Sequence, residues 1–250
     1  MTSSNSSQII VLIAGHWLGA WAWDEVLEHL AAGPHRPTAL TLPGLDPRDP
    51  YRVTRTLDDQ AAAILDHIAT LGGSRDNPVT LVGHSGANAP VSMVLDQHPE
   101  LIRSVIWVDS GPVAPGSVFA PSLPEGLAEL PLPSFDLLAE QASLTGLTPE
   151  MLDRFRAQAV PQPGPTLRQT VALTNDRRYG IPTTLVCSSI SGTQVLELAR
   201  SGHPMFAEVA RLEHATVVDL QTGHWPMWSR AGDLADTIES AATRVLAQSI

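Results

Sequence analysis

The sequence predicts an α/β fold with a mostly parallel sheet, helices on both faces of that sheet and an inserted helical cap. Strand-like apolar runs alternate with helix-like segments along most of the chain. The first of these runs, Ile9 to Ala14, is apolar at every position, as expected of a strand covered on both faces. At 250 residues and 43% hydrophobic content, the chain is expected to form one domain over residues 9–250, after a disordered segment 1–8.

The first quarter of the chain carries two strand–helix units. Ile9 to Ala14 is a continuous apolar run, and Ala20 to Ala31 follows it with apolar residues at helical spacing. Thr38 to Leu42 is a shorter strand, which Pro43-Gly44 ends. Leu57 to Leu71 again has apolar residues at helical spacing, so the same unit repeats.

The third unit and the strands after it complete the sheet. Val79 to Val82 is an apolar run followed by a helix up to Gln97, and Ser104 to Val108 is another strand of the buried type. Thr183 to Cys187 and Thr216 to Leu220 supply two more strands before a closing helix, which we expect from about Ala231 to Ala247.

The interval from Gly111 to Gly180 interrupts this alternation. It contains no strand-like run and is rich in proline in its first half. Ser134 to Ser143 and Thr148 to Ala159 are expected to be short helices, each beginning at a capping hydroxyl. A connection of roughly 70 residues between core strands is too long for a simple loop, so we interpret about 111–180 as a helical cap over the carboxyl ends of the strands.

The composition excludes several classes of protein. The formal charge is -11, and all 15 basic residues are arginine, so no concentrated basic face for nucleic acid is expected. The one cysteine, Cys187, is compatible with a reducing compartment. Because the first residues lack the pattern of a signal peptide and no apolar run is long enough for a membrane span, we expect a cytoplasmic protein that binds no membrane. The sequence does not specify the oligomeric state.

Ser85 is the candidate nucleophile. It lies in Gly83-His84-Ser85-Gly86-Ala87, between an apolar strand and a helix. Such a sharp turn exposes the serine hydroxyl and requires small neighbours, because the backbone passes close on both sides. The alternative is a glycine-rich turn that contains an incidental serine. Ala87 departs mildly from the pattern, which usually has glycine there.

A serine hydroxyl needs a base, and His224 is the best placed of the nine histidines. It follows the last predicted strand and precedes the last helix, so it is expected at the same strand-end face as Ser85. Several other histidines fall on predicted helices and are expected to be surface or packing residues.

The segment Ala14 to Trp23 (AGHWLGAWAW), together with the Ser85 turn and the late histidine, resembles the α/β-hydrolase fold superfamily. It is similar to the His-Gly-x-Trp-x-Gly-x-Trp-x-Trp segment of the small esterase and hydroxynitrile lyase branch, except that Ala14 replaces the first histidine. The resemblance implies that the backbone N–H groups of His16 and Gly86 form an oxyanion hole. It further implies that the His16 side chain can contact substrate.

The acid of the triad does not stand at its usual place in the sequence. In most relatives it follows the strand that here is Thr183 to Cys187, but Ser188-Ser189 stand there instead. Asp109 follows the neighbouring strand, where some members of the superfamily place their acid, and it is the acid we assign. It can also be a turn residue only. Asp219 is the other alternative, although it lies only five residues before His224.

These residues predict a serine hydrolase that cleaves a small or medium apolar ester or lactone without a metal or cofactor. The expected substrate-binding residues are Trp17, Trp225, Phe119, Phe135 and Leu138. Two rivals stay open, namely a non-hydrolytic lyase or cofactor-free dioxygenase on the same fold and an inactive ligand-binding relative. The lyase is disfavoured because the chain lacks the lysine that the related hydroxynitrile lyases use, and a hydrolytic dehalogenase would need a carboxylate in place of Ser85.

Overall fold

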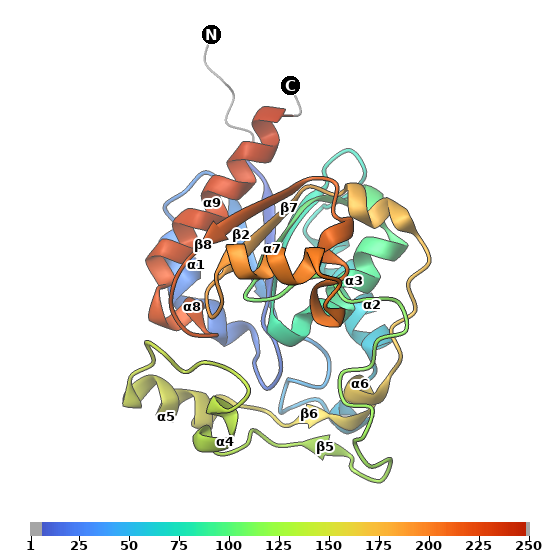
Figure 1. The fold of residues 1–250 in the computed structure, drawn as a ribbon, viewed down its shortest axis with the longest axis vertical. Helices are drawn as coiled ribbons and strands as arrows, with labels where there is room; N and C mark the ends of the chain where they lie inside the picture. Colours follow the sequence, from blue (N-terminus) through green and yellow to red (C-terminus); the bar gives the residue numbers. More distant parts are fainter. Residues whose placement is uncertain (1–6, 249–250) are drawn as a thin grey trace.

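A parallel six-stranded sheet in the order β2-β1-β3-β4-β7-β8 is the centre of the computed structural model, which describes residues 7–248 (Figure 1). The strands are β1 (Ile9–Ile13), β2 (Arg36–Leu40), β3 (Val79–His84), β4 (Ile102–Val108), β7 (Thr183–Cys187) and β8 (Ala215–Asp219). All six strands that the sequence predicts are therefore present, with ends shifted by a few residues. The α/β fold class is confirmed.

Both faces of the sheet are buried at the central strands β1, β3, β4 and β7, whereas the edge strands β2 and β8 are partly exposed. Ile9, Val11 and Ile13 of β1 belong to one hydrophobic cluster, and Ile10 and Leu12 belong to the other. Successive side chains of a strand point to opposite faces, so a strand covered on both sides is apolar at every position.

The helices form a layer on each face. The first cluster includes residues of α2 (Leu57–Thr70), α3 (Asn88–Gln97) and α7 (Gly192–Arg200), and the second includes residues of α1 (Asp24–Leu30) and α9 (Ala231–Gln248). The remaining helical turns are η1 (Ala20–Trp23), η2 (Arg52–Thr54), η3 (Ser85–Ala87), η4 (Pro99–Leu101), η5 (Asp176–Gly180), η6 (Pro204–Phe206), η7 (Val209–Arg211) and α8 (Pro226–Ser229).

The interval between β4 and β7 holds short elements that Figure 1 shows as a separate layer below the sheet. These are β5 (Glu129–Leu130), α4 (Phe135–Ala139), α5 (Pro149–Gln158), β6 (Gln162–Pro163) and α6 (Gly164–Arg168). The sequence does not predict the short antiparallel pair of β5 and β6, because two-residue strands leave no periodic pattern. The end of the interval returns to the main domain, where Val171 and Leu173 join the first cluster.

Ion pairs connect this layer to the main domain. The guanidinium of Arg52 in η2 binds the carboxylate of Glu129 in β5. Arg154 in α5 lies 2.7 Å from the Glu25 carboxylate in α1. The cap is thus attached at both ends, through its hairpin and through α5.

One helix and one end of the chain differ from the sequence analysis. The sequence does not predict helix α7, although Ser191 caps it in a reciprocal pair with Gln194. Residues 1–6 of the segment expected to be disordered lie outside the described residues. Gln8, in contrast to the expectation for this segment, is buried, and its side-chain amide donates to the Ala242 carbonyl of α9 at 2.8 Å.

Candidate active site

Ser85 stands at the sharp turn between β3 and α3. It is the first residue of η3, and its φ of +50° lies in the left-handed region that residues with a side chain rarely adopt. A Cβ on Gly15 would lie 2.7 Å from the Cβ of Ser85. The loop after β1 therefore passes directly against the serine, and only glycine leaves room for it.

The His224 imidazole joins two side chains that are far apart in sequence. Its Nε2 lies 2.8 Å from the Ser85 Oγ, and its Nδ1 lies 2.6 Å from the Asp109 Oδ2. The imidazole is 17% exposed and the carboxylate 5%. The three residues thus form a continuous hydrogen-bonded row from Ser85 through His224 to Asp109.

The Asp109 carboxylate is held by the loop that follows β7. Its Oδ1 accepts hydrogen bonds from the backbone N–H groups of Ser188 at 3.0 Å and Ser189 at 2.8 Å. Its Oδ2 accepts a third from the Ser189 hydroxyl at 2.6 Å, in addition to its bond with His224. Burial by itself would raise the pKa of this carboxyl, but the bonds from His224 and Ser189 outweigh burial and hold the pKa well below its usual value.

The backbone of Asp109 is also unusual. Its φ is +44°, and its N–H donates to the Val186 carbonyl of β7 at 2.8 Å. This conformation turns the carboxylate from β4 toward the end of β7. Strain of this kind is kept where surrounding contacts fix the residue, as the Ser188 and Ser189 bonds do here.

Asp219, the alternative acid, has a different role in the structure. Its Oδ1 accepts the N–H of Gly192 at 2.6 Å, at the first residue of α7. A carboxylate at the start of a helix satisfies an otherwise unpaired N–H group and interacts favourably with the helix dipole. The carboxylate that meets His224 is that of Asp109.

The loop that carries His224 is fixed by His84 and by the cap. The His84 Nε2–H donates to the His224 carbonyl at 2.8 Å, and the His224 N–H donates to the Ser143 carbonyl at 2.7 Å. Burial and the charge of His224 lower the pKa of His84 to about 3. His84 is therefore a neutral donor, and the sequence alone does not predict this contact because it depends on the path of a loop 140 residues away.

The two expected oxyanion donors lie beside Ser85. Within residues 7–248 the N–H of His16 has no hydrogen-bond acceptor. Gly86 is the second residue of η3, and the first N–H groups of a helix have no partner inside it. Both groups are available to a developing negative charge.

Trp17 connects the oxyanion loop to the cap. Its indole N–H donates to the Leu130 carbonyl at 3.0 Å, and its own carbonyl accepts the Val160 N–H at 3.0 Å. Its φ is +65°. Trp17, directly after His16, is thus held by the cap through both its side chain and its backbone.

The other expected pocket residues divide into two groups. Trp225 and Leu138 are buried within the second hydrophobic cluster, and Trp225 packs against the rings of Phe155 and His224. Phe135 is half-buried beside Phe155. Phe119 is 62% exposed, with its ring centroid 4.2 Å from that of His16. The structure therefore brings Phe119 and Trp17 next to the oxyanion loop and leaves Trp225 and Leu138 little surface for a ligand.

Ser188 and Ser189 are site residues that the sequence does not identify as such. Their position stands out in the sequence only because the usual acid is absent there. The signal that could have found them is the pair of small polar residues at the end of a strand adjacent to that of Asp109, since their N–H groups and hydroxyl suit a carboxylate.

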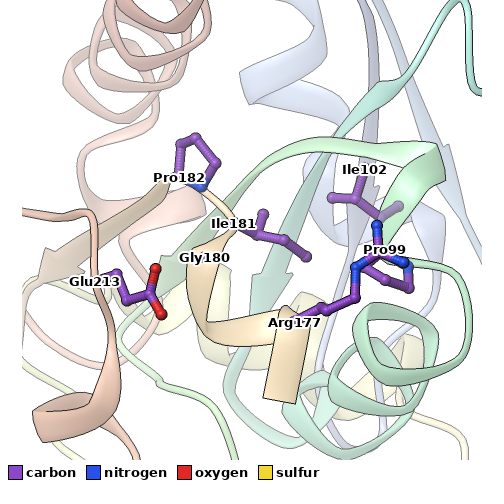
Figure 2. Close-up of a pocket in the computed structure, with 7 residues that line it drawn as sticks. All are labelled: Pro99, Ile102, Arg177, Gly180, Ile181, Pro182 and Glu213. Atoms are coloured by element: carbon purple, nitrogen blue, oxygen red, sulfur yellow. The ribbon is translucent and has the colours of Figure 1, made fainter. Parts of the chain in front are cut away.

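A hollow of about 440 Å³ lies away from this site (Figure 2). It is lined by Pro99, Ile102, Arg177, Gly180, Ile181, Pro182 and Glu213. Ile102 begins β4 and Pro182 precedes β7, so the hollow is at the amino ends of these strands, whereas Ser85 and Asp109 follow the carboxyl ends of β3 and β4.

In the described part of the chain there is no group of three His, Cys, Asp or Glu residues arranged to hold a metal ion. Among the same residues, no helix is long and apolar enough to cross a membrane.

The sequence profile of the alpha/beta hydrolase family matches residues 10–237 of this chain. The chain belongs to the alpha/beta hydrolase family. The resemblance carried by the Ser85 turn, the Ala14 to Trp23 segment and the late histidine is thereby confirmed.

Relatives with curated names include members of the esterase and hydroxynitrile lyase branch. Methylesterase 8 of Arabidopsis thaliana is 33% identical over 105 residues, which cover 41% of this chain and 38% of the relative. An alpha-hydroxynitrile lyase of the same plant is 25% identical over 161 residues, which cover 60% of each. The two matches thus span 38% and 60% of these relatives' own length, less than two thirds in each case.

The fold is shared more widely. An extracellular alpha/beta-hydrolase from a Paenibacillus species superposes with a TM-score of 0.73 at 19% identity, covering 94% of this chain and 98% of that one. At this identity the likeness concerns the fold alone. The family and the esterase relatives support a hydrolase, and its substrate is a matter for proposal.

Proposed function

We propose that this protein is a serine esterase that cleaves a small or medium carboxylic ester or lactone through an acyl-enzyme. The observation that carries the proposal is the His224 imidazole, which lies 2.8 Å from the Ser85 Oγ and 2.6 Å from the Asp109 carboxylate. Nucleophile, base and orienting acid are then Ser85, His224 and Asp109, in the chain order that is usual for this family.

The geometry supports a defined proton path. The Asp109 carboxylate accepts the Nδ1–H of His224, which leaves Nε2 as the acceptor for the Ser85 proton. As Ser85 Oγ attacks the carbonyl carbon, His224 takes that proton and later transfers it to the leaving alkoxide. A water molecule then repeats the sequence on the acyl-enzyme, and the free acid is released.

The tetrahedral intermediates carry a negative charge on the former carbonyl oxygen. The N–H groups of His16 and Gly86 are the donors we assign to it. One such donor contributes on the order of 3 kcal/mol to the transition state. Because each is a backbone group on a rigid turn, the hole is formed before substrate arrives.

Two observations argue against an inactive relative and against a non-hydrolytic enzyme. The absence of an acid directly after β7 would favour an inactive relative, but the loop at that place binds the Asp109 carboxylate through Ser188 and Ser189. The relatives named esterase or methylesterase favour ester cleavage as the reaction. Lactones remain part of the proposed range because they carry the same reacting group.

The test combines labelling with turnover. A fluorophosphonate probe should label the wild-type protein and not Ser85→Ala, and the wild type should hydrolyse short p-nitrophenyl esters. Ser74→Ala is the matched control, since Ser74 is an exposed turn residue before the amino end of β3. Undiminished ester hydrolysis by Ser85→Ala, or absence of labelling at Ser85 between neutral and mildly alkaline pH, contradicts the proposal.

A further inference from the structure

The His16 side chain occupies a specific place beside the nucleophile. A Cβ on Gly86 would lie 2.4 Å from its Nε2 and 2.5 Å from the two neighbouring ring carbons. The imidazole therefore covers Gly86 and fills the space that a side chain after the nucleophile would take. Its other neighbours are Phe119, at 4.2 Å between ring centroids, and Trp17, at 5.8 Å.

The ring nitrogens of His16 have no hydrogen-bond partner among residues 7–248. Burial and the charge of His224 lower the pKa of His16 to about 4. The imidazole is thus neutral in the working range of a serine hydrolase, with one N–H donor and one acceptor nitrogen. When a ligand enters beside Phe119 and Trp17, the ring nitrogens of His16 lose their contact with solvent. They then require a hydrogen-bond partner on the ligand.

The position of the ring limits what that partner can be. The backbone N–H of His16 is an assigned oxyanion donor, and the neighbouring Gly15 packs against Ser85. In the proposed acyl-enzyme the carbonyl oxygen points to the N–H groups of His16 and Gly86. Because the imidazole covers Gly86, we infer that the first carbon atoms of the acyl chain lie near this ring. Purely alkyl acyl chains would leave the ring nitrogens unpaired there.

We propose that the His16 imidazole hydrogen-bonds an oxygen substituent on the acyl chain of the substrate, within two bonds of the ester carbonyl. The preferred substrates are then esters or lactones of hydroxy, alkoxy or keto acids. A neutral imidazole can pair with each of these, since it both donates and accepts. This inference rests on the proposed esterase function and specifies its substrate class.

The experiment compares two acyl chains of the same length. The substrates are p-nitrophenyl methoxyacetate and p-nitrophenyl butyrate, which differ by one oxygen in place of a methylene. For each protein, kcat/KM for the methoxyacetate is divided by kcat/KM for the butyrate. The readout is this ratio in the wild type divided by the ratio in His16→Phe, so the intrinsic reactivity of the two esters cancels. His16→Phe keeps an aromatic ring and the backbone N–H and removes both nitrogens.

We expect the preference for the methoxy ester to fall about 2- to 12-fold in His16→Phe, which is the range of one net hydrogen bond. The matched control is His98→Phe, because His98 precedes η4 at the opposite end of the sheet. The control should keep the wild-type ratio. A ratio in His16→Phe that equals the wild-type ratio overturns the inference.

A second variant covers the case in which His16→Phe does not fold, as judged by circular dichroism. Gly86→Ala keeps the imidazole but forces it to move, because the new Cβ would overlap its Nε2. The methoxy preference should fall in this variant too, and an unchanged ratio in it then overturns the inference. Failure of the esterase proposal is distinct, since the wild type would then neither hydrolyse the two esters nor be labelled by the fluorophosphonate.

Discussion

Asp109→Asn separates a triad acid from a turn residue, because the contacts of the carboxylate fix how the amide must sit. Oδ1 accepts two backbone N–H groups, from Ser188 and Ser189, and the amide NH₂ cannot accept a hydrogen bond. The amide oxygen therefore stays at the Oδ1 position. The NH₂ group is placed at the Oδ2 position, opposite the Nδ1 of His224.

The NH₂ group at this position reverses the tautomer of the base. Because it can only donate, the Nδ1 of His224 must accept, and the ring proton moves to Nε2. Nε2 then faces the Ser85 hydroxyl as a donor and cannot take its proton. We expect kcat to fall by about 10⁴-fold, or about 5 kcal/mol of transition-state stabilisation.

The assay is p-nitrophenyl ester hydrolysis under saturating substrate, with the free energy of unfolding measured in urea for each protein. Asp109→Asn is nearly isosteric, so the protein should remain folded with a loss of roughly 1–3 kcal/mol from the weakened hydrogen bonds. The matched control is Asp219→Asn, which changes the carboxylate that accepts the Gly192 N–H at the start of α7 and should keep kcat within a few-fold. Asp109→Asn turnover within tenfold of wild type, or an equal loss in Asp219→Asn, would refute the assignment.

Three other changes test neighbouring contacts. Ser189→Ala removes the hydroxyl that donates to Asp109 at 2.6 Å, so kcat should fall about tenfold and largely recover in Ser189→Thr; equal kcat in all three proteins contradicts a positioning role. The pKa of His84 is lowered from 6.5 to about 3, so the unfolded chain binds a proton that the folded chain does not, and stability falls as pH drops from about 6.5 toward 3. Between pH 7.5 and 4.5 the wild type should lose about 3 kcal/mol more unfolding free energy than His84→Gln, and parallel losses in urea titrations would refute this. Trp17→Phe removes the indole donor to Leu130, so amide hydrogen exchange in β5 should quicken and the unfolding free energy should fall by about 1 kcal/mol; unchanged exchange argues against this tie to the cap.

The sequence by itself determined the sheet, the turn at Ser85 and the loop at His224. Strands covered on both faces are apolar throughout, and a serine between small residues at a strand-to-helix junction is typical of a nucleophile turn. These signals are local, so they can be read within a few residues. The N-capping residues Ser134 and Thr148 are local signals of the same kind, and α4 and α5 begin directly after them as expected.

Only the tertiary structure decided which carboxylate meets the base. Asp109 follows β4 and Asp219 is the last residue of β8, so both lie at the carboxyl ends of the strands. The sequence could favour one of them as the acid, but it could not give the distance of either carboxylate from His224. The left-handed φ of Asp109 and the two N–H groups of the loop after β7 turn its carboxylate to His224, whereas the N–H of Gly192 holds Asp219.

The contacts of the aromatic residues also depended on the tertiary structure. The positions of Trp17 and Trp225 beside the catalytic loops predicted pocket residues, but the structure buries Trp225 in the core and leaves Phe119 exposed against His16. The contact of the His16 ring with Gly86 joins two loops that are distant in sequence and leaves no periodic trace. A chain encodes its strands and turns through neighbours in sequence, whereas contacts between loops depend on how those elements pack, and that is a property of the whole fold.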